Sequence, residues 1–83
     1  MIDGIDKRGS TIDNDVAFFC ARFELTIAQA RLAAFLSKGG TLAEYASMTG
    51  IKTSTVRSHL KAIFQKVGVK RQAELVVRLL EKA

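Results

Sequence analysis

The fold is decided by residues 41–67, which read TLAEYASMTGIKTSTVRSHLKAIFQKV. Thr41 and Glu44 have the spacing of a capping box, which predicts the start of a short helix. Gly50 can adopt the left-handed conformation that ends this helix, and a second helix over 53–67 is predicted to cross the first steeply. The buried stripe of the second helix consists of apolar residues at helical spacing: Val56, Leu60, Ile63 and Val67.

The opposite face of the second helix is polar and basic. Its members are Ser54, Arg57, Ser58, Lys61 and Gln65. Small side chains permit a close approach to a DNA groove, and Arg or Lys can reach the O6 and N7 acceptors of guanine. An ordinary solvated face carries the same residue types. Residues 45–73 hold six Lys or Arg and no Asp or Glu, which favours DNA because phosphate repels carboxylates.

The composition indicates a small, basic, single-domain protein. The chain has 83 residues, a net charge of +5 and a single cysteine, Cys20, which cannot form an internal disulfide and fits a reducing compartment. The excess of Lys and Arg over Asp and Glu favours a polyanionic partner. No apolar run approaches the roughly 20 residues of a membrane span, and no secretory signal is recognisable. We therefore expect a cytoplasmic, nucleoid-associated protein with no membrane partner.

The N-terminal part divides into an arm and a helix. Residues 1–12 lack helical periodicity and are predicted to be a flexible arm, so the folded domain is expected over 13–83. A helix is predicted over 13–23. Its apolar stripe is Val16, Phe19, Cys20 and Phe23. Phe18 points the opposite way, and it either contacts a second chain or a missing neighbouring domain, or tucks under the arm.

A helix over 26–37 begins at a second capping box, formed by Thr26 and Gln29. Its predicted apolar face contains Ala28, Leu32, Phe35 and Leu36. Ala30 and Ala34 lie on the far side, where their small size permits another helix to approach closely.

The last helix, predicted over 71–82, has apolar residues on two faces. One face carries Ala73, Val76, Val77 and Leu80. Leu75 and Leu79 face the other way, and a short helix of this kind is either sandwiched or paired with a partner. We predict a homodimer contact through Leu75 and Leu79, with Phe18 as a further candidate. The predicted fold is all-α.

A set of positions between residues 25 and 80 fits one known pattern without gaps. It includes Leu25-Thr26, Gly39, Glu44, Ala46, Gly50-Ile51, Thr55-Val56, His59-Leu60, Ile63-Phe64, Lys66, Gly68-Val69 and Ala73-Glu74-Leu75-Val76. This pattern resembles the LuxR/GerE-type helix-turn-helix, the DNA-binding module of many bacterial transcription regulators. The resemblance implies four helices, here with an additional N-terminal one, and a sequence-specific regulator that binds double-stranded DNA as a dimer. It places the third family helix, about 53–67, in the major groove and the fourth at the dimer contact.

Carried over by position, the resemblance makes Arg57, Ser58 and Lys61 the base-contacting residues, with Ser54 added from the same face. Seven residues are candidates for phosphate contact: Thr41, Lys52, Thr53, Thr55, Lys66, Lys70 and Arg71. Such modules usually belong to larger regulators, so RNA polymerase and a missing sensory domain are further candidate partners. No cofactor or metal is expected.

Three departures from the family pattern stand out. Ile27-Ala28-Gln29-Ala30-Arg31 replaces a Pro-Arg-Glu-Arg-Glu-like run, which weakens an expected salt bridge from the first family helix. Lys52 stands where a capping residue usually precedes the recognition helix, so that cap is expected to be missing unless Thr53 takes it over. Arg71 likewise replaces a capping residue before the last helix.

Two other functions fit the same residues. A sigma-factor region 4-like module would contact promoter DNA while bound to RNA polymerase, and a protein-interaction adaptor would use the exposed apolar patches. An enzyme is not expected, because no nucleophile, base and orienting group converge. The lone His59, at the edge of the buried stripe, is interpreted as structural.

Overall fold

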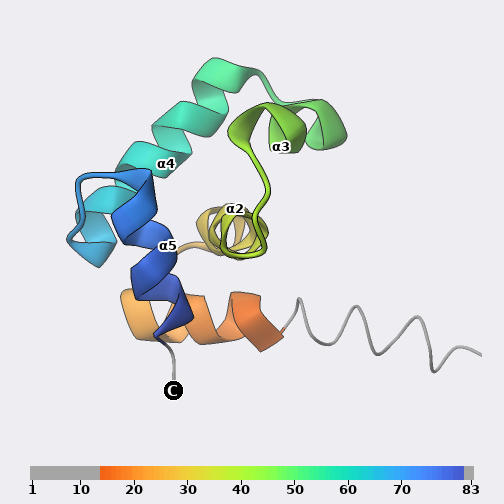
Figure 1. Ribbon diagram of the computed structural model, residues 1–83. Coiled ribbons are helices and arrows are strands. Elements are labelled where there is room, and N and C mark those ends of the chain that lie inside the picture. Colours follow the sequence, from red (N-terminus) through yellow and green to blue (C-terminus); the bar gives the residue numbers. More distant parts are fainter. Residues whose placement is uncertain (1–13, 82–83) are drawn as a thin grey trace, which may run out of the picture.

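The computed structural model describes residues 14–81, and every regular element among them is a helix (Figure 1). A first helix covers residues 14–23. It is followed by α2 (Ile27–Ser37), α3 (Leu42–Thr49), α4 (Thr53–Val67) and α5 (Gln72–Leu80). The all-α prediction, with four helices and an additional N-terminal one, is confirmed. The arm predicted over 1–12 lies outside the described residues.

α2 lies at the centre of the molecule, where Figure 1 views it end-on, and packs against α3, α4 and α5. Five of its residues are buried: Ala30, Leu32, Ala33, Ala34 and Leu36. Ala30 and Ala34, which were predicted to lie where another helix can approach, are both buried. Ala28, expected on the apolar face, is exposed, because the neighbouring helices cover the sides of α2 that carry the other alanines.

Reciprocal hydrogen bonds fix where α2 and α3 begin. Thr26 Oγ1 accepts from the backbone N of Gln29 at 3.1 Å, and Gln29 Oε1 accepts from the backbone N of Thr26 at 3.0 Å. Thr41 and Glu44 form the same pair of bonds at the start of α3, at 3.1 and 2.9 Å. Both predicted capping boxes are confirmed, and losing a cap hydroxyl of this kind costs about 0.5–2 kcal/mol.

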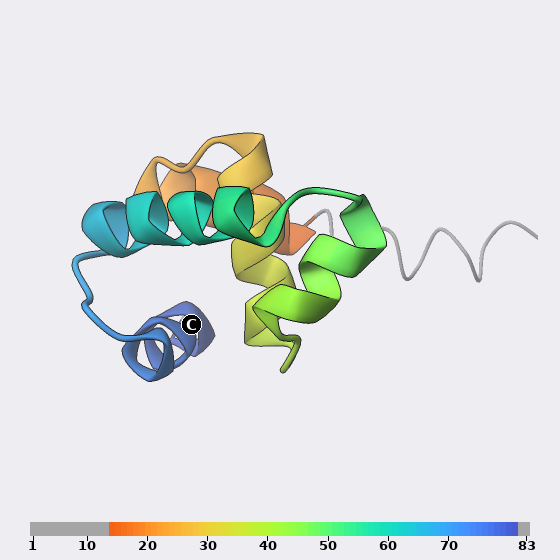
Figure 2. The ribbon, with the colours of Figure 1, turned by 90° about the horizontal axis from the view of Figure 1, so that it is seen from above.

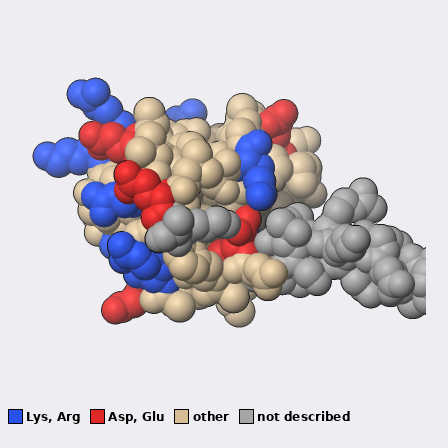
Figure 3. Space-filling model, turned by 60° about the horizontal axis from the view of Figure 1, so that its bottom comes forward, with Lys and Arg blue, Asp and Glu red and all other residues tan. Residues whose placement is uncertain are grey.

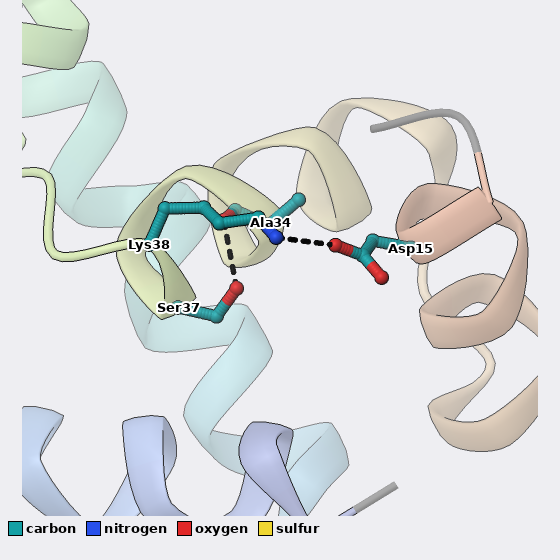
Figure 4. Close-up of polar contacts among 4 residues, drawn as sticks. All are labelled: Asp15, Ala34, Ser37 and Lys38. Atoms are coloured by element: carbon teal, nitrogen blue, oxygen red, sulfur yellow. Dashed lines mark hydrogen bonds and ion pairs between the residues drawn. The ribbon is translucent and has the colours of Figure 1, made fainter. Parts of the chain in front are cut away.

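The N-terminal helix is held to α2 by apolar packing and an ion pair. Three residues of its predicted apolar stripe, Val16, Phe19 and Phe23, are buried, and the fourth, Cys20, is half-buried. Asp15, which is buried, lies 3.3 Å from Lys38 Nζ at the end of α2 (Figure 4). Phe18 is half-buried and meets the ring of Phe19 edge-on, with 5.9 Å between centroids. Part of the Phe18 surface, which was predicted to contact either another chain or domain or the N-terminal arm, is thus used against Phe19.

The dimer contact predicted through Leu75 and Leu79 is wrong, because both side chains have no exposed surface in the single chain. α5 packs against α2 and α4, and the two leucines, one helical turn apart, fill the space toward these helices. The outer face is the one with Val77 and Leu80, which are 58% and 61% exposed. The prediction that α5 has two apolar faces is confirmed. The prediction of which face lies in the core was wrong, because Leu75 and Leu79 are buried and Val77 and Leu80 are exposed.

The loop between α2 and α3 has no room for a side chain at Gly40. A Cβ atom there would overlap the ring of Phe35, which packs on Tyr45 of α3 with 5.4 Å between centroids. We expect Gly40→Ala to lower the free energy of unfolding by about 1–3 kcal/mol, because the ring must leave its position. Chemical denaturation measures this change. In a Phe35→Leu background the same substitution is expected to cost less, and an equal cost in both backgrounds would show that the ring is not the obstacle.

Candidate nucleic-acid interface

α3 and α4 are joined by a short turn and cross steeply, as Figure 2 shows. Gly50 ends α3 in the left-handed conformation, with φ 74° and ψ 11°, and its N–H donates to the carbonyl O of Ala46 at 2.9 Å. Ile51 follows and packs against the core, which anchors the turn. The two helices form the predicted helix-turn-helix.

The two faces of α4 lie as the sequence predicts. The inner face is buried: Val56, Leu60, Ile63 and Val67. The outer face carries the four residues predicted to contact bases, all of them exposed: Ser54, Arg57, Ser58 and Lys61. Ser58 Oγ donates to the carbonyl O of Ser54 at 3.2 Å, so this hydroxyl keeps acceptor lone pairs for a ligand. The surface thus combines small hydroxyls with two long cationic donors.

α4 begins without a side-chain cap. Lys52 occupies the N-cap position and makes no capping hydrogen bond, which confirms the predicted absence of a cap; Thr53 lies inside the helix and does not replace it. No acidic residue lies in the first turn. Thr53 and Thr55 are both exposed there. The backbone N–H groups and the positive end of the helix dipole therefore face solvent beside hydroxyl groups, an arrangement suited to an anion.

Lys66 is exposed at the surface, but its ammonium group is bonded within the chain. Its Nζ donates to the carbonyl O of Glu24 and to Oε1 of Gln29, both at 3.1 Å. Among residues 14–81, Glu24 is the one non-glycine with positive φ, at 57°, so Lys66 supports an unfavourable link between the N-terminal helix and α2. The partner that Gln29 offers to Lys66 is a neutral amide oxygen, so this contact is a hydrogen bond and not an ion pair. These two bonds argue against the phosphate contact predicted for Lys66.

The remaining phosphate candidates lie around α3, α4 and the loop before α5. Lys70 and Arg71 are exposed, and neither forms an ion pair with another described residue. Their backbone N–H groups donate to Glu74 Oε1 at 3.0 and 3.2 Å, so Glu74 supports the start of α5. The Thr41 hydroxyl accepts a capping bond and keeps its own proton to donate.

Basic side chains gather on the side of the molecule where α4 ends. Figure 3, which brings the bottom of the molecule forward, shows Lys and Arg at this edge with a few Asp and Glu between them. Arg22, Lys66 and Arg78 line a hollow of about 400 Å³. Arg22 and Arg78 were not among the predicted site residues. Arg22 and Arg78 come from separate helices, so no local motif groups them. The sequence signal to which they contribute is the net charge of +5.

Other functional groups are few in the described part of the chain. His59 is half-buried on α4, in line with its predicted place at the edge of the stripe. Over residues 14–81 no group of three His, Cys, Asp or Glu residues is placed to hold a metal ion. None of the helices in this range combines the length and the apolar character needed to cross a bilayer.

Comparison with known proteins identifies the family. The GerE profile, described as bacterial regulatory proteins of the luxR family, matches residues 24–79, which closely agrees with the predicted match over 25–80. Searches of curated proteins and of solved structures found no match. The profile covers more than half of the 83 residues and includes the whole helix-turn-helix. The chain therefore belongs to the LuxR family of bacterial regulatory proteins and carries its DNA-binding helix-turn-helix domain.

Proposed function

We propose that this protein is a sequence-specific, double-stranded DNA-binding regulator of transcription that acts as a homodimer. The observation that supports this most directly is the outer face of α4. Its hydroxyl and cationic side chains stand exposed together on a helix whose opposite face is fully packed. Such a helix suits insertion into the major groove with its N-terminal half against the base edges.

The proposed contacts divide into two groups. Arg57 and Lys61 donate to guanine O6 and N7, while Ser54 and Ser58 permit the close approach and add hydrogen bonds. The phosphate contacts come from Lys52, Lys70 and Arg71, with the hydroxyls of Thr41, Thr53 and Thr55. Lys66 is left out of this set because its ammonium group already bonds within the chain. The first group gives specificity, and the second gives affinity and register.

The salt dependence of binding tests this division. Lys70→Ala is expected to weaken binding to all duplexes alike and to reduce the slope of log K against log salt concentration by about 1. Lys66→Met, the matched control, is expected to keep the slope and to lower the free energy of unfolding by about 1 kcal/mol. Fluorescence anisotropy at several salt concentrations measures the slopes. An equal fall in slope for both variants would place Lys66 on a phosphate and contradict its internal role.

The proposed dimer uses the outer face of α5. Val77 and Leu80 are two of the four large hydrophobic side chains that stand exposed in the described part of the chain, and Ala73 on the same face is exposed as well. Neighbouring exposed apolar residues are typical of an interaction surface. A two-fold dimer through this face would carry two copies of α4, one for each half of a two-fold symmetric DNA site.

Replacement of this apolar face tests the dimer. Val77→Glu/Leu80→Glu is expected to give a monomer at concentrations where the wild type is a dimer, because each chain would bring two carboxylates into the contact. Light scattering coupled to size-exclusion chromatography measures the mass. Ile27→Glu, on a residue that is 62% exposed at the start of α2, is the control and should leave the mass unchanged. A dimer that persists in the double variant would rule out the α5 face.

The proposed setting is the bacterial cytoplasm, in association with the nucleoid, with RNA polymerase or a sensory domain as further partners. Stable binding of a specific duplex by the protein alone would favour the regulator over a sigma-factor-like module. Failure to bind any duplex at low salt would favour the adaptor function instead.

A further inference from the structure

An apolar groove lies between the N-terminal helix, α2 and α3, and none of the described residues that line it belongs to α4. It has a volume of about 320 Å³, near the lower end of the range found for small-molecule sites in proteins. The rings of Phe35 and Tyr45, with 5.4 Å between centroids, give it an aromatic wall. The rest of its apolar lining consists of Val16, Ala34 and Met48. The groove therefore suits the apolar body of a small molecule.

Two cations border this groove, and they differ in whether a neighbouring carboxylate compensates their charge. Lys38 Nζ lies 3.3 Å from a carboxylate oxygen of Asp15, which is buried (Figure 4). Arg31 is exposed and forms no ion pair with another described residue. Among the described residues, no Asp or Glu lines the groove. Within this part of the chain, the rim thus carries one positive charge without a partner, on Arg31.

Tyr45 adds a polar group to the groove. Its backbone N–H donates to the carbonyl O of Thr41 at 3.0 Å, and its carbonyl O accepts from Thr49 Oγ1 at 2.7 Å. The phenol hydroxyl forms no hydrogen bond with another described residue, so it keeps a proton to donate. A guanidinium group binds a carboxylate through two parallel N–H···O bonds, and a phenol can donate a further one. A carboxylate is therefore the charged group that the polar atoms of this groove suit.

We propose that this groove binds a small carboxylic acid, with its carboxylate beside Arg31 and its apolar body against the aromatic wall. The single positive charge without a partner favours a monocarboxylate over a polyanion, and the volume favours a small molecule over a helix of another protein. The occupant contacts the helix-turn-helix through Tyr45 and Met48 of α3 and not through α4. The proposal does not depend on DNA binding, so the two can fail separately.

Titration of the full 83-residue chain with phenylbutyrate tests the proposal. This probe joins a phenyl ring to one carboxylate, and a ligand of its size is expected to bind with a dissociation constant of roughly 0.1–1 mM. Two-dimensional NMR of the backbone amides measures the constant, and the largest shifts are expected in α2 and α3 around the groove. Phenylbutyramide, which has the same shape and no charge, should bind about tenfold more weakly. Butyrate, which lacks the ring, should bind more weakly still because it buries little apolar surface.

Two matched variants separate this site from the general positive charge of the protein. Arg31→Gln is expected to bind phenylbutyrate about tenfold more weakly and to bind phenylbutyramide as the wild type does. Arg22→Gln removes the same charge from an exposed residue that does not line the groove, so it should leave both constants near their wild-type values. Far-UV circular dichroism verifies that both variants retain their helices.

Four results would overturn the proposal. Equal constants for phenylbutyrate and phenylbutyramide in the wild type would show that Arg31 holds no carboxylate. An equal loss of affinity in Arg31→Gln and Arg22→Gln would assign binding to the net charge of the protein. Shifts that do not saturate, or that lie mainly on α5, would show that the groove is not the site. Shifts around the groove that change with protein concentration before any probe is added would show that a second copy covers it.

Discussion

Leu79→Ala is expected to lower the free energy of unfolding by about 2–5 kcal/mol, whereas Leu80→Ala is expected to change it by less than about 0.5 kcal/mol. The two leucines are neighbours in the sequence and occupy opposite faces of α5. Leu79 has no exposed surface and contributes to the core beside α2 and α4, while Leu80 is 61% exposed. Removing Leu79 leaves a cavity, but truncating Leu80 removes atoms that solvent already surrounds.

Thermal unfolding at a low protein concentration, at which the dimer is dissociated, measures both substitutions. A domain of this size loses about 4–8 °C in Tm per kcal/mol, so Leu79→Ala should lower Tm by roughly 8 °C or more. Leu75→Ala, on the same buried face, should behave like Leu79→Ala. If Leu80→Ala were as damaging as Leu79→Ala in the monomer, α5 would be rotated from the position described above.

Arg57→Ala and Lys61→Ala are each expected to reduce the preference for the cognate duplex over a duplex with one substituted guanine by about 5- to 150-fold. This corresponds to about 1–3 kcal/mol for each lost base contact. Both side chains are exposed on the outer face of α4, and the buried inner face of that helix fixes their direction. The loss of preference should appear at one base position for each variant, because each side chain reaches a different part of the groove.

Competition binding with single-base variants of the cognate duplex measures this effect. Lys70→Ala is the control, since a phosphate contact supplies affinity for every duplex and no base preference. A uniform loss of affinity in Lys61→Ala, with the base preference unchanged, would assign Lys61 to the phosphate backbone and not to base readout.

The helix boundaries of this fold could be read from the sequence because their signals are local. Thr26 with Gln29, and Thr41 with Glu44, are capping pairs three residues apart, and both form the predicted bonds. Gly50 ends α3 in the left-handed conformation that glycine adopts without strain. The stripe on α4 repeats with the helical period, so its inner and outer faces were also predictable.

The orientation of α5 and the role of Lys66 could not be read in this way. Both faces of α5 are apolar, so periodicity identifies two faces but not which one meets α2 and α4. Lys66 bonds to residues 42 and 37 positions earlier in the chain, and no local pattern signals so distant a partner. Lys66 occupies a position for which the family resemblance suggested a phosphate contact. In this structure its ammonium group bonds to Glu24 and Gln29, on either side of the point where α2 begins.

Selection of bound duplexes from a random DNA pool tests the central claim most directly, which is that the outer face of α4 reads base sequence. We expect enrichment of one two-fold symmetric motif containing guanines, and the loss or alteration of that motif when the selection is repeated with Arg57→Ala/Lys61→Ala. No enriched motif with the wild-type protein, or the same motif from the double variant, would show that this face of α4 does not read base sequence.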